Sequence, residues 1–249
     1  MTKIIGISGR KQAGKNTLAN YINGSILKKR NMVQDFYIDD DGQLAINTED
    51  VAGNTGYGIL DVTRKDETFT EYARKELWPY VKVYHFADYL KEMSINLFNL
   101  KPEEVYGNDD KKNTKVDYLL WENMPENAEN KSGSMTNREF LEHFGTKIIR
   151  KIKTDAWVHA TIQRVLSEKP EVAVIPDVRF PNEVEAIQNA RGFVIRLKRD
   201  IFNSDTESEA ALDPDRFNWS KFDCVIDNSN ATIANVCDAI SKFSFIWGV

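Results

Sequence analysis

Short apolar runs alternate along this chain with stretches whose apolar residues recur at helical spacing. Five runs rich in β-branched residues predict buried strands, and the amphipathic stretches between and after them predict helices. The predicted strands cover residues 3–8, 81–86, 171–175, 193–198 and 224–226, and the predicted helices cover 17–27, 88–98, 138–151, 155–168, 181–190 and 232–243. This alternation predicts a three-layer α/β fold, in which helices flank a parallel sheet.

Two stretches interrupt the alternation. From about 31 to 72 the pattern becomes acidic and irregular, and residues 36–47 predict a β-hairpin around Asp-Asp-Gly. From about 101 to 135 polar residues dominate, with too few apolar positions to add a layer to the core, so we expect a second excursion or a mobile segment. We therefore predict one domain over 1–249 with two inserted excursions.

The composition narrows the class of protein. The 249 residues are 41% apolar and 29% charged, as in a globular protein, and no stretch approaches the roughly 20 apolar residues of a membrane helix. Because the first residues lead into a strand without an export signal, we expect a cytoplasmic protein with no membrane partner. The net charge of -5 argues against a nucleic-acid partner. We expect Cys224 and Cys237, which have no histidine nearby, to be small core residues.

The strongest chemical signal is a glycine-rich loop between the first predicted strand and helix. Its spacing fits G-x4-G-K, in the strand-to-helix context that this motif requires. The backbone N–H groups and the helix N-terminus would hold phosphates, and Lys15 would reach the β- and γ-phosphates. The residues expected to bind ATP are Gly9, Lys11, Gln12, Ala13, Gly14, Lys15, Asn16 and Thr17. The alternative is that Gly9 and Gly14 only shape a tight turn.

The metal side of this loop departs from the usual pattern. Asn16 stands where Ser or Thr normally touches magnesium, and the hydroxyl is displaced to Thr17. We therefore expect Asn16 and Thr17 to be the residues nearest to Mg²⁺, with Thr17 acting through water.

A second signal follows the third predicted strand. Asp177 and Arg179 come just past the carboxyl end of that strand, where open α/β sheets bind ligands, and Glu183 lies on the next helical turn. An arginine there can bind a phosphate in bidentate fashion and stabilise charge on a transferring group. The alternative is a buried Asp177–Arg179 pair that holds the loop together.

A third signal follows the second strand. Phe86, Asp88 and Lys91 lie where a carboxylate could bind a sugar hydroxyl or base amine and a lysine could bind a phosphate. The alternative is an acidic residue at a helix N-terminus and a solvated lysine. The histidines, which belong to no catalytic grouping, are His85, His143 and His159. A phosphate acceptor, whose second pKa is near 6, would need no base.

Several blocks recur together in this order in one known family. The blocks are 8–17 (SGRKQAGKNT), 86–91 (FADYLK), 138–146 (REFLEHFGT), Trp157, 176–183 (PDVRFPNE) and 206–209 (TESE). With them the chain resembles the deoxynucleoside monophosphate kinases of tailed bacteriophages, which have a P-loop kinase fold. The resemblance implies ATP- and Mg²⁺-dependent phosphorylation of deoxynucleoside monophosphates to diphosphates, in the host cytoplasm if the protein is phage-encoded.

The resemblance also implies roles for individual residues. Lys15, Arg179 and Asp177 would be catalytic, and Arg179 would bridge the two phosphates. The residues that would bind the acceptor or shape its pocket are Phe86, Asp88, Lys91, Arg138, Trp157, Asp177, Arg179, Glu183 and Glu209. Of these, Glu209 would belong to a segment near a lid, and the lid candidates lie around 196–216. Thr206 stands where the family commonly has histidine.

Other functions remain open at this level. The acidic excursion has no counterpart in the resemblance and could form a dimer contact or a lid. A P-loop kinase for another small metabolite would need Asp88 or Asp177 as base if its acceptor were a hydroxyl. A nucleotide-binding switch protein would bind ATP without turnover stimulated by an acceptor. The expected partner is a small-molecule deoxynucleoside monophosphate, and a homodimer is left open.

Overall fold

The protein folds into two compact units. The computed structural model describes residues 2–49, 52–127, 129–199 and 207–248. The first unit combines Met1–His85 with Ile162–Val249, and the second is Phe86–Thr161. The second unit is therefore inserted between two parts of the chain that fold together.

A five-stranded parallel sheet forms the centre of the first unit. Its strands are β1 (Lys3–Ser8), β5 (Val81–Val83), β8 (Val172–Val178), β9 (Phe193–Lys198) and β10 (Cys224–Asp227). Their order is β10-β9-β1-β8-β5, with every neighbouring pair parallel. The predicted α/β class is confirmed, and β1 lies at the middle of the sheet.

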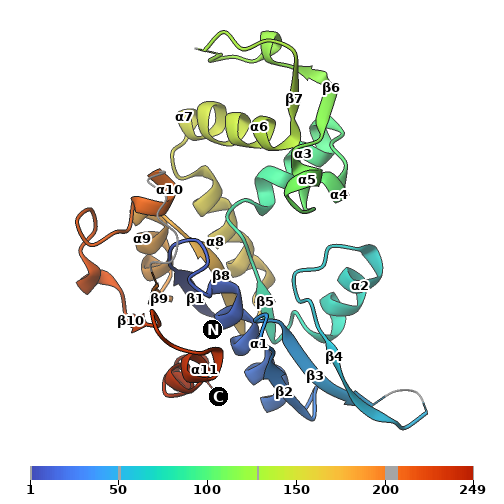
Figure 1. The fold of residues 1–249 in the computed structure, drawn as a ribbon, viewed down its shortest axis with the longest axis vertical. Helices are drawn as coiled ribbons and strands as arrows, with labels where there is room; N and C mark the ends of the chain where they lie inside the picture. The colour runs from blue at the N-terminus through green and yellow to red at the C-terminus, as the bar shows by residue number, and fades with distance from the viewer. Residues whose placement is uncertain (1, 50–51, 128, 200–206, 249) are drawn as a thin grey trace. The chain divides into compact units, whose positions relative to one another are not determined.

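Helices cover both faces of this sheet, which explains why its strands are continuous apolar runs. Ile5 and Ile7 of β1 are buried in the core formed with α1 (Lys15–Lys29) and α11 (Ile233–Ser241). On the opposite face, Gly6 packs so closely on α9 (Pro181–Asn189) that an added Cβ would lie 2.7 Å from Ile187 Cδ1. Figure 1 shows α1 and α9 on either side of β1. The two cysteines are free thiols, Cys224 buried and Cys237 partly buried.

The strand before the second signal is longer than predicted. β8 continues through Pro176 and Asp177 to Val178, so Asp177 lies within the strand and not beyond it. The pairing of β1 with β8 shifts register between Gly6 and Ser8. Such an irregularity lets a strand tolerate a proline, which cannot donate to the ladder.

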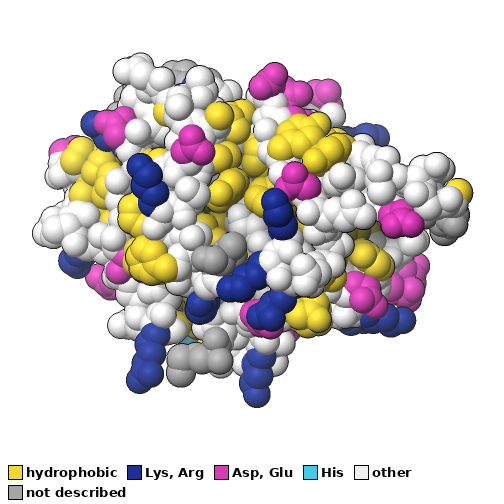
Figure 2. Space-filling view, turned by 90° about the horizontal axis from the view of Figure 1, so that it is seen from below, with side chains coloured by type: hydrophobic (Ala, Val, Ile, Leu, Met, Phe, Trp, Pro, Cys, Tyr) yellow, Lys and Arg dark blue, Asp and Glu magenta, His cyan; other side chains and the backbone are white. Residues whose placement is uncertain are grey.

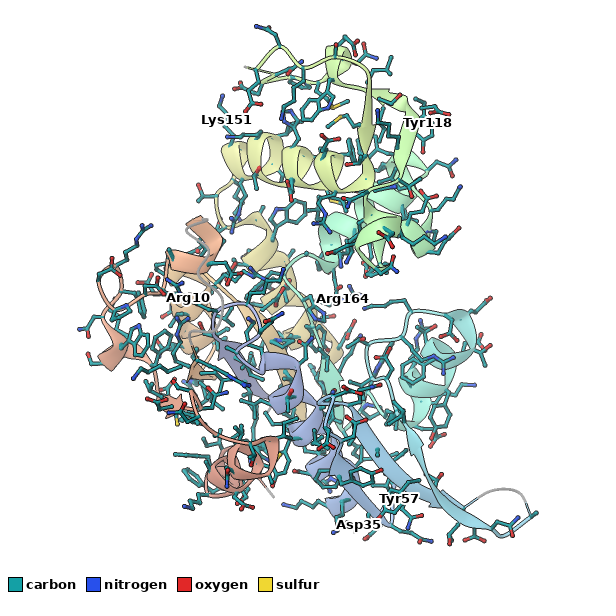
Figure 3. All side chains as sticks on the ribbon, viewed as in Figure 1. Arg10, Asp35, Tyr57, Tyr118, Lys151 and Arg164 are labelled. Carbon is teal, nitrogen blue, oxygen red and sulfur yellow. The ribbon has the colours of Figure 1, made fainter. Side chains whose placement is uncertain are left out.

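The acidic excursion forms a separate antiparallel sheet in the first unit. The predicted hairpin is confirmed as β2 (Asp35–Ile38) and β3 (Leu44–Glu49), but a third strand, β4 (Thr55–Ile59), and a helix, α2 (Glu67–Glu76), were not predicted. β4 lacks the alternation of apolar and polar residues that predicts a strand, because Gly56 and Gly58 have no side chains. Figure 3 shows Asp35 and Tyr57 close together on this sheet, where the Tyr57 hydroxyl lies 3.4 Å from Asp35 Oδ2.

The second unit has a small core of its own. Its elements are α3 (Asp88–Phe98), α4 (Pro102–Val105), α5 (Asp109–Lys112), β6 (Lys115–Leu120), β7 (Ser134–Thr136), α6 (Asn137–Glu142), a π-helix (His143–Ile149), α7 (Arg150–Ile152) and the beginning of α8 (Ala156–Glu168). Its buried apolar residues are Leu100, Val105, Val116, Leu119, Trp121, Met135, Phe140 and Phe144. The expectation that 101–135 contributes too few apolar residues to a core was wrong, because five of these eight lie in it.

The surface carries mixed side chains. Figure 2 shows one face on which apolar, basic and acidic side chains are interspersed. Within the described residues, every helix is too short or too polar to cross a membrane.

Candidate active site

The glycine-rich loop joins β1 to α1 in a tightly wound backbone. Gly14 has φ 87°, in the left-handed region that glycine adopts without strain, and the Ala13 N–H donates to Arg10 O at 3.1 Å. Gly9 is equally constrained, since an added Cβ would lie 3.0 Å from Ala13 Cβ and 3.2 Å from Leu197 O. Both glycines of the predicted motif are thus required by the backbone path.

The Lys15 side chain folds back along the loop. Its Nζ donates to Gly9 O at 2.7 Å and to Arg10 O at 2.8 Å. The pKa of Lys15 is lowered to about 8, chiefly by burial and also by the positive charges of Arg179 and Arg196, while the negative charge of Glu209 acts in the opposite direction. The ammonium is therefore charged at neutral pH and lies among groups of both signs.

A carboxylate occupies the mouth of the loop. Glu209, on α10 (Glu207–Ala210), accepts a hydrogen bond from the backbone N–H of Lys11 through Oε2 at 2.6 Å. Its Oε1 forms an ion pair with Arg179 Nη1, and only 10% of the side chain is exposed. The loop N–H, Arg179 and Lys15 thus surround an anion. Thr206, the first residue of the predicted lid-side block, lies outside the described residues.

The turn after β8 is held by Glu183. Its Oε2 accepts from the backbone N–H groups of Arg179 at 2.6 Å and Phe180 at 3.0 Å, and its side chain is buried. Glu183 therefore supports the segment that carries Arg179. Asp177 lies near enough for its negative charge to offset part of the lowering of the Lys15 pKa. The structure brings Lys15, Asp177, Arg179 and Glu209 together.

Sequence reasoning missed an ion-pair network that fixes the loop. Arg10 donates from Nε to Asp213 Oδ1 at 3.2 Å and pairs through Nη2 with Oδ2, and Figure 3 marks Arg10 beside the loop. Arg196 Nη1 donates to Ser8 Oγ at 3.0 Å, and its Nη2 lies 3.5 Å from Asp213 Oδ1. Arg196 is buried on β9 with its guanidinium 5.1 Å from the Trp219 ring centre, so it is a fixed strand residue and not a lid arginine.

Asn228 also holds the loop, although it was not among the residues predicted from the sequence. Its Nδ2 donates to Ala13 O at 2.9 Å, and a Cβ added at Gly14 would lie 3.6 Å from the same nitrogen. Its position directly after β10, at the carboxyl edge of the sheet, is the signal that could have identified it.

Asn16 and Thr17, the residues expected to lie nearest to Mg²⁺, carry side-chain oxygens. Asn16 is exposed at the second position of α1, and Thr17 follows it, close to Gly42 of the inserted sheet. Within the described residues there is no group of three or more His, Cys, Asp or Glu side chains that could hold a metal. Such a site fits Mg²⁺ held mainly by nucleotide phosphates and water, with one or two protein oxygens.

The remaining predicted residues lie in the second unit. Phe86 and Asp88 are buried at the start of α3, and Lys91 Nζ lies 4.7 Å from the Tyr106 ring centre. Arg138 Nη2 donates to Asp109 Oδ1 at 2.6 Å, and Trp157 Nε1 donates to Gly145 O at 3.2 Å. The Trp157 bond joins α8 to the π-helix, a rare element that often marks functional segments.

Fold and loop together define a class of protein. A parallel sheet with a glycine-rich loop after its middle strand, and with Lys15 and Arg179 around an anion, is consistent with the P-loop kinase fold. A sequence model described as "Deoxynucleotide monophosphate kinase" matches residues 3–238, and the chain belongs to this family of kinases.

A viral relative agrees with this assignment. The chain is 29% identical over 132 residues to an Acanthamoeba polyphaga mimivirus protein named "Putative deoxynucleotide monophosphate kinase". The aligned part covers 48% of this chain and 62% of the mimivirus protein, so the chain spans less than two thirds of that relative's length. This relative comes from a giant virus, whereas the resemblance in the sequence is to proteins of tailed bacteriophages.

Proposed function

We propose that the protein transfers the γ-phosphoryl group of ATP, bound with Mg²⁺, to a deoxynucleoside monophosphate and so forms the diphosphate. One observation carries the proposal: the Lys11 N–H and the Arg179 guanidinium bind the Glu209 carboxylate beside Lys15. A carboxylate is the internal anion most similar to a phosphate oxygen pair. Groups that bind it there are suited to a phosphoryl group.

The loop would hold the donor. Its backbone N–H groups and the N-terminus of α1 would bind the phosphate oxygens. Lys15 would give up its hydrogen bonds to Gly9 O and Arg10 O and bind the β- and γ-phosphates instead. Asn228 and Asp213 would keep the loop in its wound form, because they bind Ala13 O and Arg10.

Arg179 would bind the phosphoryl group that is transferred. Its side chain is 39% exposed, and Glu183 fixes its backbone, so its guanidinium is free to exchange Glu209 for phosphate oxygens while its Cα stays in place. A guanidinium between two phosphates reduces their repulsion and stabilises charge that spreads over the transferring group. Asp177 would balance the positive charges of Lys15 and Arg179.

Asn16 and Thr17 would hold the metal, Thr17 through water. A bound Mg²⁺ would neutralise charge on the β- and γ-phosphates. In the first unit, Asp177, Arg179 and Glu183 are proposed to bind the acceptor. For the second unit, the acceptor-binding residues predicted from the sequence are Phe86, Asp88, Lys91, Arg138 and Trp157. The acceptor phosphate is already ionised near neutral pH, so no general base is required. A cytoplasmic location and a homodimer remain predictions.

The test is ADP release coupled to a dehydrogenase, with ATP and Mg²⁺, in the presence of each deoxynucleoside monophosphate, each ribonucleotide counterpart or a nucleoside. Lys15→Ala and Arg179→Ala are compared with Arg74→Ala, a surface arginine on α2. We expect deoxynucleoside monophosphates to stimulate turnover, the first two variants to lose at least about 100-fold in rate, and Arg74→Ala to match wild type.

The outcomes separate the alternatives. Stimulation by a nucleoside alone, with a rate that falls in acid, would indicate a hydroxyl acceptor and a carboxylate base. ATP binding without stimulation by any acceptor would indicate a nucleotide switch. Either result would overturn the proposed reaction.

A further inference from the structure

The inserted sheet is attached to the nucleotide loop through its first turn. Gly42 has φ 79°, and a Cβ added there would overlap Thr17 Oγ1 and lie 3.4 Å from Thr17 Cβ. Asn20 Nδ2 donates to Gly42 O at 2.9 Å. Asp39 Oδ1 accepts from the backbone N–H groups of Asp41 at 3.0 Å and Gln43 at 2.7 Å. The turn is therefore held by hydrogen bonds of its own and lies against the first turns of α1.

A cavity of about 670 Å³ lies next to this turn, between β2, α1 and the start of α11. Figure 1 shows these three elements close together in the first unit. The residues that give the cavity its chemistry are Tyr21, Tyr37, Asp40, Arg199 and Thr232. The volume is within the range of about 300–1,000 Å³ that holds small ligands, and aromatic rings, a guanidinium and a carboxylate are groups that stack on a base or bind its polar edge.

Arg199 provides a separate indication of a ligand. Its Nε is buried and has no hydrogen-bond partner among the described residues. A buried donor without an acceptor is costly, and a ligand in the cavity that Arg199 lines would remove that cost. Burial also raises the pKa of the Tyr21 phenol above its ordinary value.

The orientation of the donor follows from the loop. Lys15, Arg179 and Glu209 mark the end that would hold the γ-phosphate. Asn228 binds the other end, at Ala13, and three residues later the chain enters the cavity wall at Ala231. A triphosphate that places its γ-phosphate beside Arg179 therefore directs its nucleoside toward Asn228 and the cavity.

We propose that the inserted sheet is a nucleotide-binding element, and that its Tyr37 and Asp40, with Arg199, hold the base and ribose of the donor ATP. The inference rests on the proposed function, which supplies the donor. It assigns a role to the acidic excursion, which contains none of the proposed catalytic residues. Asp40 would bind polar groups of the nucleoside, and Tyr37, which is 49% exposed, would pack against it when it binds.

The experiment compares two ligands by titration calorimetry with the full-length protein: Mg-ATP and Mg-tripolyphosphate, which has the same phosphates but no nucleoside. The variants are Tyr37→Ala and Arg199→Ala. Asp41→Asn is the matched control, because Asp41 is exposed in the same turn and lies outside the cavity lining. We expect both variants to bind Mg-ATP about tenfold more weakly, with tripolyphosphate binding unchanged in Tyr37→Ala. Asp41→Asn should match wild type.

Each outcome decides between supporting and overturning the inference. If either variant binds Mg-ATP as wild type does, the inference fails while the proposed function stands. Equal weakening of both ligands by Tyr37→Ala would mean that the sheet acts only through the loop, and would also overturn it. Wild type that binds neither ligand would overturn the proposed function as well. A Tyr37→Trp variant adds a second readout, since its fluorescence should change with Mg-ATP and not with tripolyphosphate.

Discussion

Glu209 accepts a hydrogen bond from the Lys11 backbone at 2.6 Å, although 198 positions separate the two residues in the sequence. The same carboxylate pairs with Arg179, so one side chain joins the loop after β1 to the turn after β8. In this arrangement Glu209 competes with a phosphate for the same donors. Binding of a nucleotide then requires that the carboxylate be displaced.

Removing the charge of Glu209 should therefore strengthen binding of Mg-ATP. For Glu209→Gln we expect the dissociation constant to fall by about tenfold, since one charge-assisted hydrogen bond no longer competes. Calorimetry measures this directly. Asp215→Asn is the control, because Asp215 lies in the same segment and is largely exposed. Weaker binding by Glu209→Gln would mean that the carboxylate supports the nucleotide and does not compete with it.

The pKa of Lys15 predicts how nucleotide binding depends on pH. Burial lowers this pKa to about 8, and only the protonated amine attracts phosphate. The affinity for Mg-ATP should therefore fall as pH rises above about 8. Lys15→Arg should lack this decline, because arginine stays charged throughout the range. A decline of equal size in both proteins would assign the pH dependence to another group.

The same shift predicts a change in stability with the opposite sign. Because the folded pKa is below the ordinary 10.5, the unfolded chain binds more protons between about pH 8 and 10.5. The free energy of unfolding should therefore rise with pH across this window, relative to Lys15→Met. Urea unfolding at pH 7.5 and at pH 9.5 measures the difference. A free energy of unfolding that changes equally in both proteins would contradict the shift.

Asp213 should be the most sensitive carboxylate of the loop network. It pairs with Arg10 and lies close to the buried Arg196, so Asp213→Asn leaves two guanidinium groups less well neutralised. We expect a loss of about 3 kcal/mol in the free energy of unfolding. Asp215→Asn should change stability by less than about 0.5 kcal/mol. Similar effects of the two substitutions would argue against a structural role for the network.

Gly24 should be essential for attaching the inserted sheet to α1. Glycine to alanine in a helix normally gains about 1 kcal/mol, but an added Cβ would lie 2.7 Å from Phe36 Cε2 and Cγ. We expect the overlap to dominate, and Gly24→Ala to destabilise the protein by about 2 kcal/mol. In the background of Phe36→Ala, which removes the ring, Gly24→Ala should be stabilising. Thermal unfolding of the four proteins completes this double-mutant cycle.

The parts of the fold with strong local patterns were predictable from the sequence. The helix at 88–98 and the strands at 3–8 and 193–198 have the predicted bounds, because continuous apolar runs and an amphipathic stretch specify them. β4 was missed because its glycines and exposed positions give no alternating pattern. The core of the second unit was missed because its apolar residues are sparse in sequence and gather only in the fold.

The candidate site was predictable to a similar degree. The loop and Lys15 follow from one local motif, and Arg179 from its place beyond a strand. The contacts of Glu209 and Asp213 with the loop could not be read from the sequence, since each spans about 200 positions, whereas Asn228 could have been identified from its place directly after a strand. Glu183 was predicted as a substrate-binding residue, and the structure adds that its carboxylate holds the backbone of Arg179. Whether it also binds substrate stays a prediction.

The place of β1 between β8 and β9 has a consequence for synthesis on the ribosome. β1 is made first, but its neighbours begin at Val172 and Phe193, in the second half of the chain. The second unit is complete before either neighbour exists. The apolar strand β1 therefore has neither neighbour to pair with while Phe86–Thr161 is translated. This segment can fold before β1 is paired. The wound form of the nucleotide loop, which follows β1, is therefore acquired among the last steps of folding.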